Sequence, residues 1–114
     1  MRKPDPNDPG MYEVQTGEVV TLQVTAFGTA ELVQMGVDGT TLSPPFQFTV
    51  TKRPGERHIV STNFSFSPGA TDARYEVNIT GSRGGSFAIN HIRPGGIQDP
   101  DFTFVVLPGD PIAP

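Results

Sequence analysis

The sequence predicts an all-β domain, folded as a Greek-key sandwich of about seven or eight antiparallel strands. Apolar and polar residues alternate along several short stretches, which is typical of strands with one buried and one wet face. The 114 residues include 13 Gly and 12 Pro, which supply frequent turns between these stretches. Successive strands about eight to twelve residues apart, with no convincing helix between them, are typical of a sandwich.

The clearest alternation lies in residues 56–80, which we interpret as a central hairpin of two strands. The side chains expected to face the core are Val60, Phe64, Phe66, Tyr75, Val77 and Ile79. Between the strands, Pro68 presets its own φ and Gly69 accepts a positive φ, so the chain can reverse there. Tyr75 stands where Greek-key sandwiches often hold a core tyrosine whose hydroxyl bonds to the loop before it.

Further strands are expected on both sides of this hairpin, at residues 11–15, 19–27, 31–37, 40–42, 46–51, 86–92 and 101–107. Asp38 and Gly39 predict a two-residue turn, because both tolerate positive φ. Pro44 and Pro45 interrupt the ladder, since proline cannot donate a hydrogen bond to it. The final strand is apolar on both faces, which indicates that it is buried on both sides or lies at an interface.

The chain has the length of one domain, which we place at residues 11–108. Residues 1–10, rich in Pro and Asp, are interpreted as an N-terminal tail or linker, and residues 109–114 as a C-terminal tail. No run of about 18 apolar residues occurs, so no membrane span is expected. The basic N-terminus lacks the apolar segment of a signal peptide, so we expect either an intracellular chain or a mature or excised fragment.

Composition narrows the functional class. The net charge is −4, whereas nucleic-acid binders carry a basic surface, so nucleic acid is not an expected partner. Without cysteine the chain has no disulfide framework and no thiolate metal site. We find no acid, base and nucleophile in a recognisable motif, and we expect His58 and His91 to lie at the surface or rim. The chain is therefore not expected to be an enzyme.

Two stretches carry motifs of one known family. Residues 37–42 follow the pattern Val-Asp-Gly-x-x-Leu, residues 45–48 read Pro-Phe-Gln-Phe, and residues 17–24 read Gly-Glu-Val-Val-Thr-Leu-Gln-Val. These motifs resemble the bacterial immunoglobulin-like repeats, similar to fibronectin type III domains, of surface and secreted proteins. The resemblance implies an immunoglobulin-like spacer or adhesion domain, located outside the cell or at its surface. Its expected partners are proteins or neighbouring domains of a larger chain.

Two acidic segments have the chemistry of calcium ligands. Residues 5–8, Asp-Pro-Asn-Asp, are similar to the Asp-x-Asn-Asp-Asn linker that binds calcium between cadherin repeats, with Pro9 in place of the last Asn. The candidate ligands are Asp5, Asn7, Asp8, Asp99 and Asp101. Calcium takes about six to eight oxygen ligands. We therefore favour plain linker and turn roles for these residues. No cofactor is expected, and calcium bound by these residues is the alternative.

Three alternatives to a spacer or adhesion domain stay open: a calcium-stabilised adhesion repeat, a virion or appendage decoration protein, and a carbohydrate-binding module. The last usually needs exposed aromatic side chains. The chain has no Trp, so Tyr12 and Phe27 are the candidate surface contacts. A protein partner, or weak self-association, is expected at open sheet edges such as residues 40–42, or at the final strand.

Overall fold

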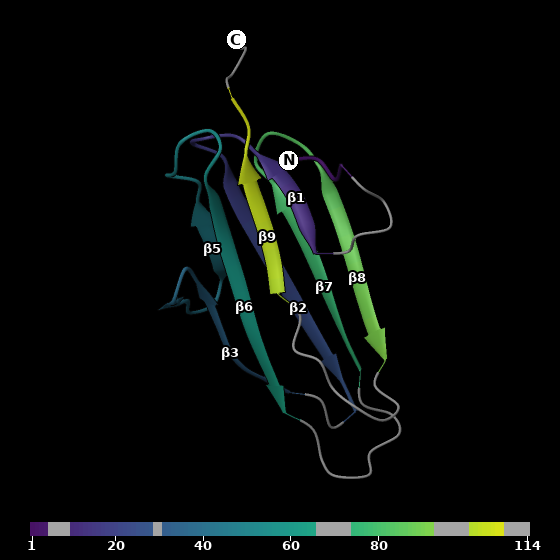
Figure 1. Cartoon of the computed structure of the whole chain (residues 1–114). Coiled ribbons are helices and arrows are strands. Elements are labelled where there is room, and N and C mark those ends of the chain that lie inside the picture. Colours follow the sequence, from purple (N-terminus) through teal and green to yellow (C-terminus); the bar gives the residue numbers. More distant parts are fainter. Residues whose placement is uncertain (5–9, 29–30, 66–73, 93–100, 109–114) are drawn as a thin grey trace.

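The computed structural model describes residues 1–4, 10–28, 31–65, 74–92 and 101–108, with the backbone alone for residues 90–92 (Figure 1). The described residues form nine strands and no helix, which confirms the all-β class. The strands are β1 Met11–Val14, β2 Val19–Phe27, β3 Glu31–Val37, β4 Thr40–Thr41, β5 Phe46–Thr49, β6 Arg57–Ser65, β7 Arg74–Gly81, β8 Ser86–Ile92 and β9 Asp101–Val106. In this part of the chain there is accordingly no helix of the length and apolarity that a membrane crossing needs.

The strands form two sheets that lie one over the other (Figure 1). The first sheet has five strands in the order β1-β9-β6-β3-β4, and the second has four in the order β5-β2-β7-β8. Strand β1 pairs with β9 in parallel, whereas the sequence predicted antiparallel strands. The other pairs are antiparallel. The parallel pair places the first and last strands of the chain side by side.

The predicted hairpin at residues 56–80 is wrong in its pairing, although both of its strands exist. Strand β6 lies between β3 and β9 in the first sheet, and β7 lies between β2 and β8 in the second. The chain therefore crosses from one sheet to the other between them. The two strands lie in opposite sheets, and each buries one face against the core between them. Strands in this arrangement show the same alternation of polar and apolar residues as two strands paired in one hairpin. Alternation therefore cannot distinguish the two arrangements.

The turn at Asp38 and Gly39 forms as predicted and joins β3 to β4. Both residues have positive φ, 51° at Asp38 and 84° at Gly39. Two positive values are the signature of a type I′ turn, whose twist matches that of the flanking strands. Gly36 pairs with Thr41 across this short hairpin. The hairpin therefore ends the first sheet at an edge only two residues long.

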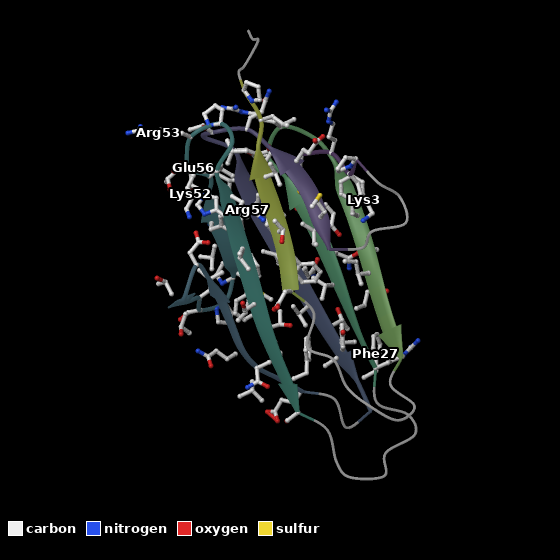
Figure 2. All side chains as sticks on the ribbon, viewed as in Figure 1. Lys3, Phe27, Lys52, Arg53, Glu56 and Arg57 are labelled. Atoms are coloured by element: carbon white, nitrogen blue, oxygen red, sulfur yellow. The ribbon has the colours of Figure 1, made fainter. Side chains whose placement is uncertain are left out.

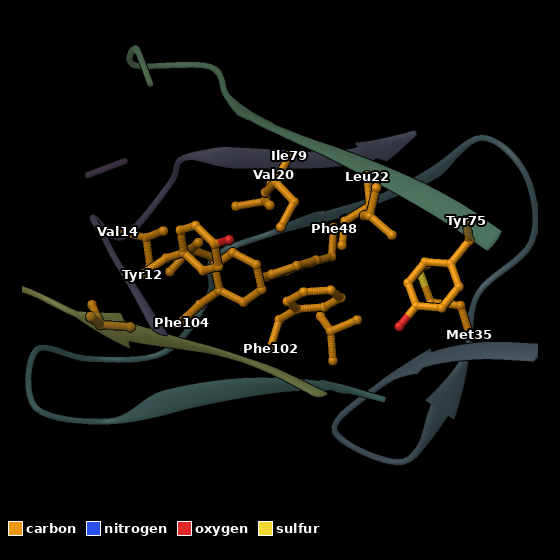
Figure 3. Packing of buried hydrophobic residues seen from close by; sticks show 14 of the residues in the cluster. Tyr12, Val14, Val20, Leu22, Met35, Phe48, Tyr75, Ile79, Phe102 and Phe104 are labelled. Atoms are coloured by element: carbon orange, nitrogen blue, oxygen red, sulfur yellow. The ribbon is translucent and has the colours of Figure 1, made fainter. Parts of the chain in front are cut away.

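The core lies between the sheets and is rich in aromatic rings (Figure 3). Its buried aromatic residues are Tyr12, Phe48, Phe64, Tyr75, Phe102 and Phe104. The Tyr12 ring stacks on Phe104 with centroids 5.3 Å apart, and Phe104 meets Phe48 edge-on at 5.4 Å. Phe64 of one sheet stacks on Tyr75 of the other at 4.1 Å. These contacts join β1, β5, β6, β7 and β9, so a single core holds both sheets together.

Strand β9 is an interior strand, not an open edge. It lies between β1 and β6, and Phe102, Phe104 and Val106 point into the core. Val105 and Leu107, on the opposite face, are half-buried. The sequence predicted that this strand is buried on both sides or lies at an interface; its second apolar face is in fact partly exposed.

Candidate functional site

The calcium candidates are not brought together within the described residues. Asp5, Asn7, Asp8 and Asp99 lie outside these residues. Asp101 begins β9, is exposed and pairs in register with Ser61. Among the described residues, no group of three or more His, Asp or Glu side chains lies close enough to hold a metal ion. The described part of the site thus offers one carboxylate of the several that calcium needs.

Tyr12 is a core residue, which corrects its prediction as a surface contact. Its side chain is 0% exposed, and its ring lies between those of Phe104 and Phe87, whose centroid is 5.5 Å away. The Lys3 ammonium lies 4.9 Å from the ring centroid. The physical reason is that β1 is held by β9, so its alternate residues Tyr12 and Val14 point between the sheets.

Phe27 lies at the end of β2 and is partly exposed. It pairs across the strands with Arg74, whose guanidinium carbon lies 4.1 Å from the ring centroid. This cation–π contact covers one face of the ring. Figure 2 places Phe27 at the opposite end of the sandwich from Arg53. Tyr12 and Phe27 were the two aromatic residues predicted to contact a carbohydrate. Because Tyr12 is buried, the two rings do not form a shared aromatic binding surface.

His58 is buried, whereas the sequence predicted a surface or rim position. Its side chain is 5% exposed and its ring packs against Phe48, with centroids 5.2 Å apart. Nδ1 lies 2.6 Å from Asp38 Oδ2, and the backbone N–H of Thr51 donates to Nε2 over 3.3 Å. Since Nε2 accepts a hydrogen bond, the neutral ring carries its proton on Nδ1 and donates it to Asp38. His91 lies in β8, where its side chain is outside the described part of the structure.

Asp38 connects this histidine to the turn between β3 and β4. Its Oδ1 accepts the backbone N–H of Ile59 over 2.8 Å, and Lys52 Nζ lies 3.7 Å from Oδ2. Burial raises the pKa of Asp38, but the hydrogen bonds from the Ile59 N–H and from His58, together with the electrostatic attraction of the His58 ring and the Lys52 ammonium, lower it more. The net pKa therefore lies below the ordinary value of 3.8. The carboxylate fastens the turn to β6.

A polar hollow of about 200 Å³ lies beside this turn, over β3, β4 and β6. Its lining residues are Gln34, Gly36, Gly39, Thr41, Ser61, Thr62 and Asn63. Gln34 Nε2 donates to Thr41 Oγ1 over 2.9 Å, which bridges β3 and β4. A Cβ at Gly36 would lie 3.0 Å from the carbonyl oxygen of Thr40, so glycine lets the chain after the turn approach β3 closely. We call this surface the β3–β4–β6 hollow.

The hollow is uncharged, and it offers neutral hydrogen-bonding groups beside a larger exposed surface of carbon atoms. Its lining residues are amides, hydroxyls and glycines, and none is charged. Small-molecule sites commonly enclose about 300–1,000 Å³, so the hollow suits part of a larger ligand better than a whole cofactor. The sequence indicated the edge at residues 40–42 as a place for a partner, but not the hollow beside it. The signal that could have found it is Gly36, which interrupts a predicted strand with a residue that often marks close approach of another backbone.

An ion pair between the Met1 ammonium and the Glu18 carboxylate lies at one end of the sandwich. The Met1 ammonium lies 2.7 Å from Oε2 of the fully buried Glu18, and it also donates to the Gly84 carbonyl oxygen over 3.0 Å. Met1 itself is partly buried. Glu18 Oε1 accepts the backbone N–H of Gln15 over 3.2 Å. A Cβ on Gly81 would overlap the Glu18 carboxylate. These contacts leave the carboxylate no room for a substrate and give it a structural role.

Comparison with known proteins adds no further assignment, because no family model, curated protein or solved structure matches the chain. The function is therefore argued from the geometry of the described residues.

Proposed function

We propose that this chain is a non-catalytic structural or binding module. The observation that carries the proposal is the bonding of His58, whose two ring nitrogens are both engaged, one by Asp38 and one by Thr51. A buried histidine held in this way is not free to exchange protons with a bound substrate. Its contacts instead fix the β3–β4 turn to β6, which is a structural task.

The finer fold class that we propose is an immunoglobulin-like Greek-key sandwich in the broad sense. The crossing between β6 and β7 supports it, because Greek-key sandwiches place some consecutive strands in different sheets. The strand order of the four-stranded sheet differs from that of immunoglobulin domains. In immunoglobulin domains the second strand lies between the first and the fifth. In this chain β2 lies between β5 and β7.

The biological setting that we propose is a spacer or adhesion domain of a bacterial surface or secreted protein, acting outside the cell. The support is the motif in residues 37–48, whose Asp-Gly pair occupies a tight turn between two strands. A protein partner, or a neighbouring domain of a longer chain, is the expected contact. The calcium-stabilised repeat and the decoration protein remain alternatives.

The β3–β4–β6 hollow is the surface that we propose for a partner. It offers donors and acceptors on paired strands, and its rim is held by the Asp38–His58 pair, so little ordering is needed on binding. An extended peptide, with its regular N–H and C=O groups, fits this chemistry. A carbohydrate chain is the second candidate, because hydroxyl groups also bond to amides and hydroxyls. It is less favoured, since Tyr12 and Tyr75 are buried.

The test is an amide chemical-shift titration of the ¹⁵N-labelled chain with a Gly-Ser repeat peptide and with oligosaccharides of glucose and of N-acetylglucosamine. We expect the peptide to shift the amides of Gly36, Thr41 and Ser61. Replacing Ser61 with Arg should abolish the shifts by filling the hollow, whereas Ser65→Arg, an exposed position on the same strand, should not. Peptide shifts that persist in Ser61→Arg would overturn the assignment of the surface. Shifts with an oligosaccharide alone would favour the second candidate.

A further inference from the structure

The two sheets have four edge strands, and three of them carry features that discourage pairing with another chain. β4 is two residues long and is followed at once by Ser43, Pro44 and Pro45. β5 is four residues long and begins directly after Pro45. β1 is also four residues long, and the backbone of Arg2 covers its outer edge with two hydrogen bonds to Glu13, of 2.9 and 2.8 Å. Short strands, prolines and covered edges are the usual means by which native sheets stay unpaired.

The fourth edge, β8, has none of these features. It runs for seven residues, from Ser86 to Ile92, and contains no Pro, Lys, Arg, Asp or Glu. It pairs in unbroken register with β7, without the bulge that would twist an edge away. Within the described residues, no backbone hydrogen bond joins its outer side to another segment. Figure 1 shows β8 as a long strand at the border of the sheet. A long, uncharged, regular edge is a template for a further strand.

The inner face of β8 is also incomplete. Phe87 and Ile89 pack against the core, yet both remain partly exposed, whereas Val77 and Ile79, their partners on β7, are fully buried. The outward residues Ser86 and Ala88 are small and exposed. An added strand would cover the remaining apolar surface of Phe87 and Ile89, and on the outer face it would lie beside the small residues Ser86 and Ala88.

We propose that β8 pairs antiparallel with β8 of a second copy of this chain, so that the two four-stranded sheets join into one sheet of eight strands. A two-fold axis places identical patches against each other. β8 is suited to this because it carries no fixed charge that would face itself across the axis. The same symmetry sets the apolar residues Phe87 and Ile89 of the two copies close together, which extends the core across the axis.

This proposal concerns a different surface from the β3–β4–β6 hollow and does not depend on what the hollow binds. Pairing along one edge buries less than the roughly 1,200 Å² at which stable interfaces begin, so we expect a weak dimer. Each copy carries a net charge of −4, and the resulting repulsion is screened by salt. Dimerisation should therefore strengthen as the salt concentration is raised.

Sedimentation equilibrium at concentrations from roughly micromolar to millimolar tests the proposal. The native chain should approach twice its monomer mass. The double variant Ser86→Lys with Ala88→Lys should weaken the dimer by at least about tenfold, because lysines discourage edge pairing. The matched control places the same two charges at exposed positions of the edge strand β5, as Gln47→Lys with Thr49→Lys, and should dimerise like the native chain. Circular dichroism melts of each variant establish that it is folded.

Cysteine cross-linking gives an independent readout, because the chain has no cysteine of its own. Antiparallel neighbours have Cα atoms about 4.5–5.5 Å apart, within the reach of a disulfide. Ala88→Cys or Ile89→Cys, near the middle of β8, should give covalent dimers on mild oxidation, and Thr41→Cys should not. A monomer at the highest concentration, or a dimer that the β8 lysines leave intact, would overturn the proposal. Either result leaves the ligand titration of the hollow unaffected.

Discussion

Replacing Asp38 with Asn tests whether the Asp38–His58 pair holds the β3–β4 turn. The substitution keeps the size of the side chain, and Asn also tolerates the positive φ of 51° at this position. The amide oxygen can still accept the Ile59 N–H. The amide nitrogen, however, would face His58 Nδ1, which now donates to the carboxylate. To accept instead, the ring would move its proton to Nε2 and point it at the Thr51 N–H.

The expected cost follows from the loss of one hydrogen bond to a charged group, which contributes about 1.5–3 kcal/mol. The Asp38 side chain is 30% exposed, so solvent screening places the value at the lower end, near 1.5–2 kcal/mol. For a domain of 114 residues each kcal/mol moves the melting temperature by about 4 °C. We therefore expect Asp38→Asn to melt about 6–8 °C below the native chain at neutral pH.

The pH dependence has a definite sign. The pKa of Asp38 is lower in the folded chain than its ordinary value of 3.8. Its contribution to the free energy of unfolding is therefore fully present above that value and is lost as the pH falls through the lower folded pKa. The difference between the native chain and Asp38→Asn should be constant near neutral pH and should shrink below a pH of about 4.

Urea denaturation followed by circular dichroism, at neutral pH and near pH 3, measures both effects. Glu31→Gln is the matched control, because it makes the same charge change at an exposed residue for which the described structure gives no ion pair. The reasoning is refuted if the two variants lose the same stability at neutral pH. It is equally refuted if the deficit of Asp38→Asn grows, instead of shrinking, as the solution becomes acidic.

The other predictions concern the Met1–Glu18 ion pair, the core and calcium. Glu18→Gln leaves the part-buried ammonium without its charged partner and should cost about 1.5–3 kcal/mol in urea denaturation; a loss below 1 kcal/mol would contradict the pairing. Gly81→Ala forces a Cβ into the Glu18 carboxylate and should cost about 1–3 kcal/mol; an unchanged midpoint would show that the site can relax. Phe104→Ala removes a fully buried ring stacked on Tyr12 and should cost about 3–5 kcal/mol, measured by the same method. Melting curves in millimolar calcium and in chelator should coincide, whereas an upward shift of several degrees would favour the calcium-stabilised repeat.

The sequence predicts local features of this fold well, because these depend on neighbouring residues. Alternation identifies the buried face of β6 and β7, and residues such as Val60 and Val77 are fully buried as expected. The Asp38–Gly39 pair identifies its turn because few residue types accept positive φ. Alternation fails at the end of β2, because Ala26 falls on the same face as the buried Val20 and Leu22 but is exposed. There the strand reaches the end of the sandwich.

The candidate site could not be predicted in the same way, because its residues meet across strands that are distant in sequence. His58 is 20 residues from the carboxylate that binds it, and an isolated histidine in a polar stretch carries no sign of that partner. Tyr12 likewise looks like a residue of a short, exposed strand until β1 is known to pair with β9. In both cases burial is decided by pairing between strands, and pairing does not follow from period alone.

The difference between local sequence features and strand pairing also determines which surface is the best candidate for a partner. Local features single out residues 40–42, next to two prolines, and the final strand, with its two apolar faces. Strand order changes both interpretations: β4 is an edge but is too short for a further strand to pair with it, and β9 lies between β1 and β6. β8 has no conspicuous residue, and its lack of charge and proline is informative only because, within the described residues, no strand pairs with its outer side. An edge is a property of the whole sheet, so the surface most suited to pairing is one that the sequence could not identify.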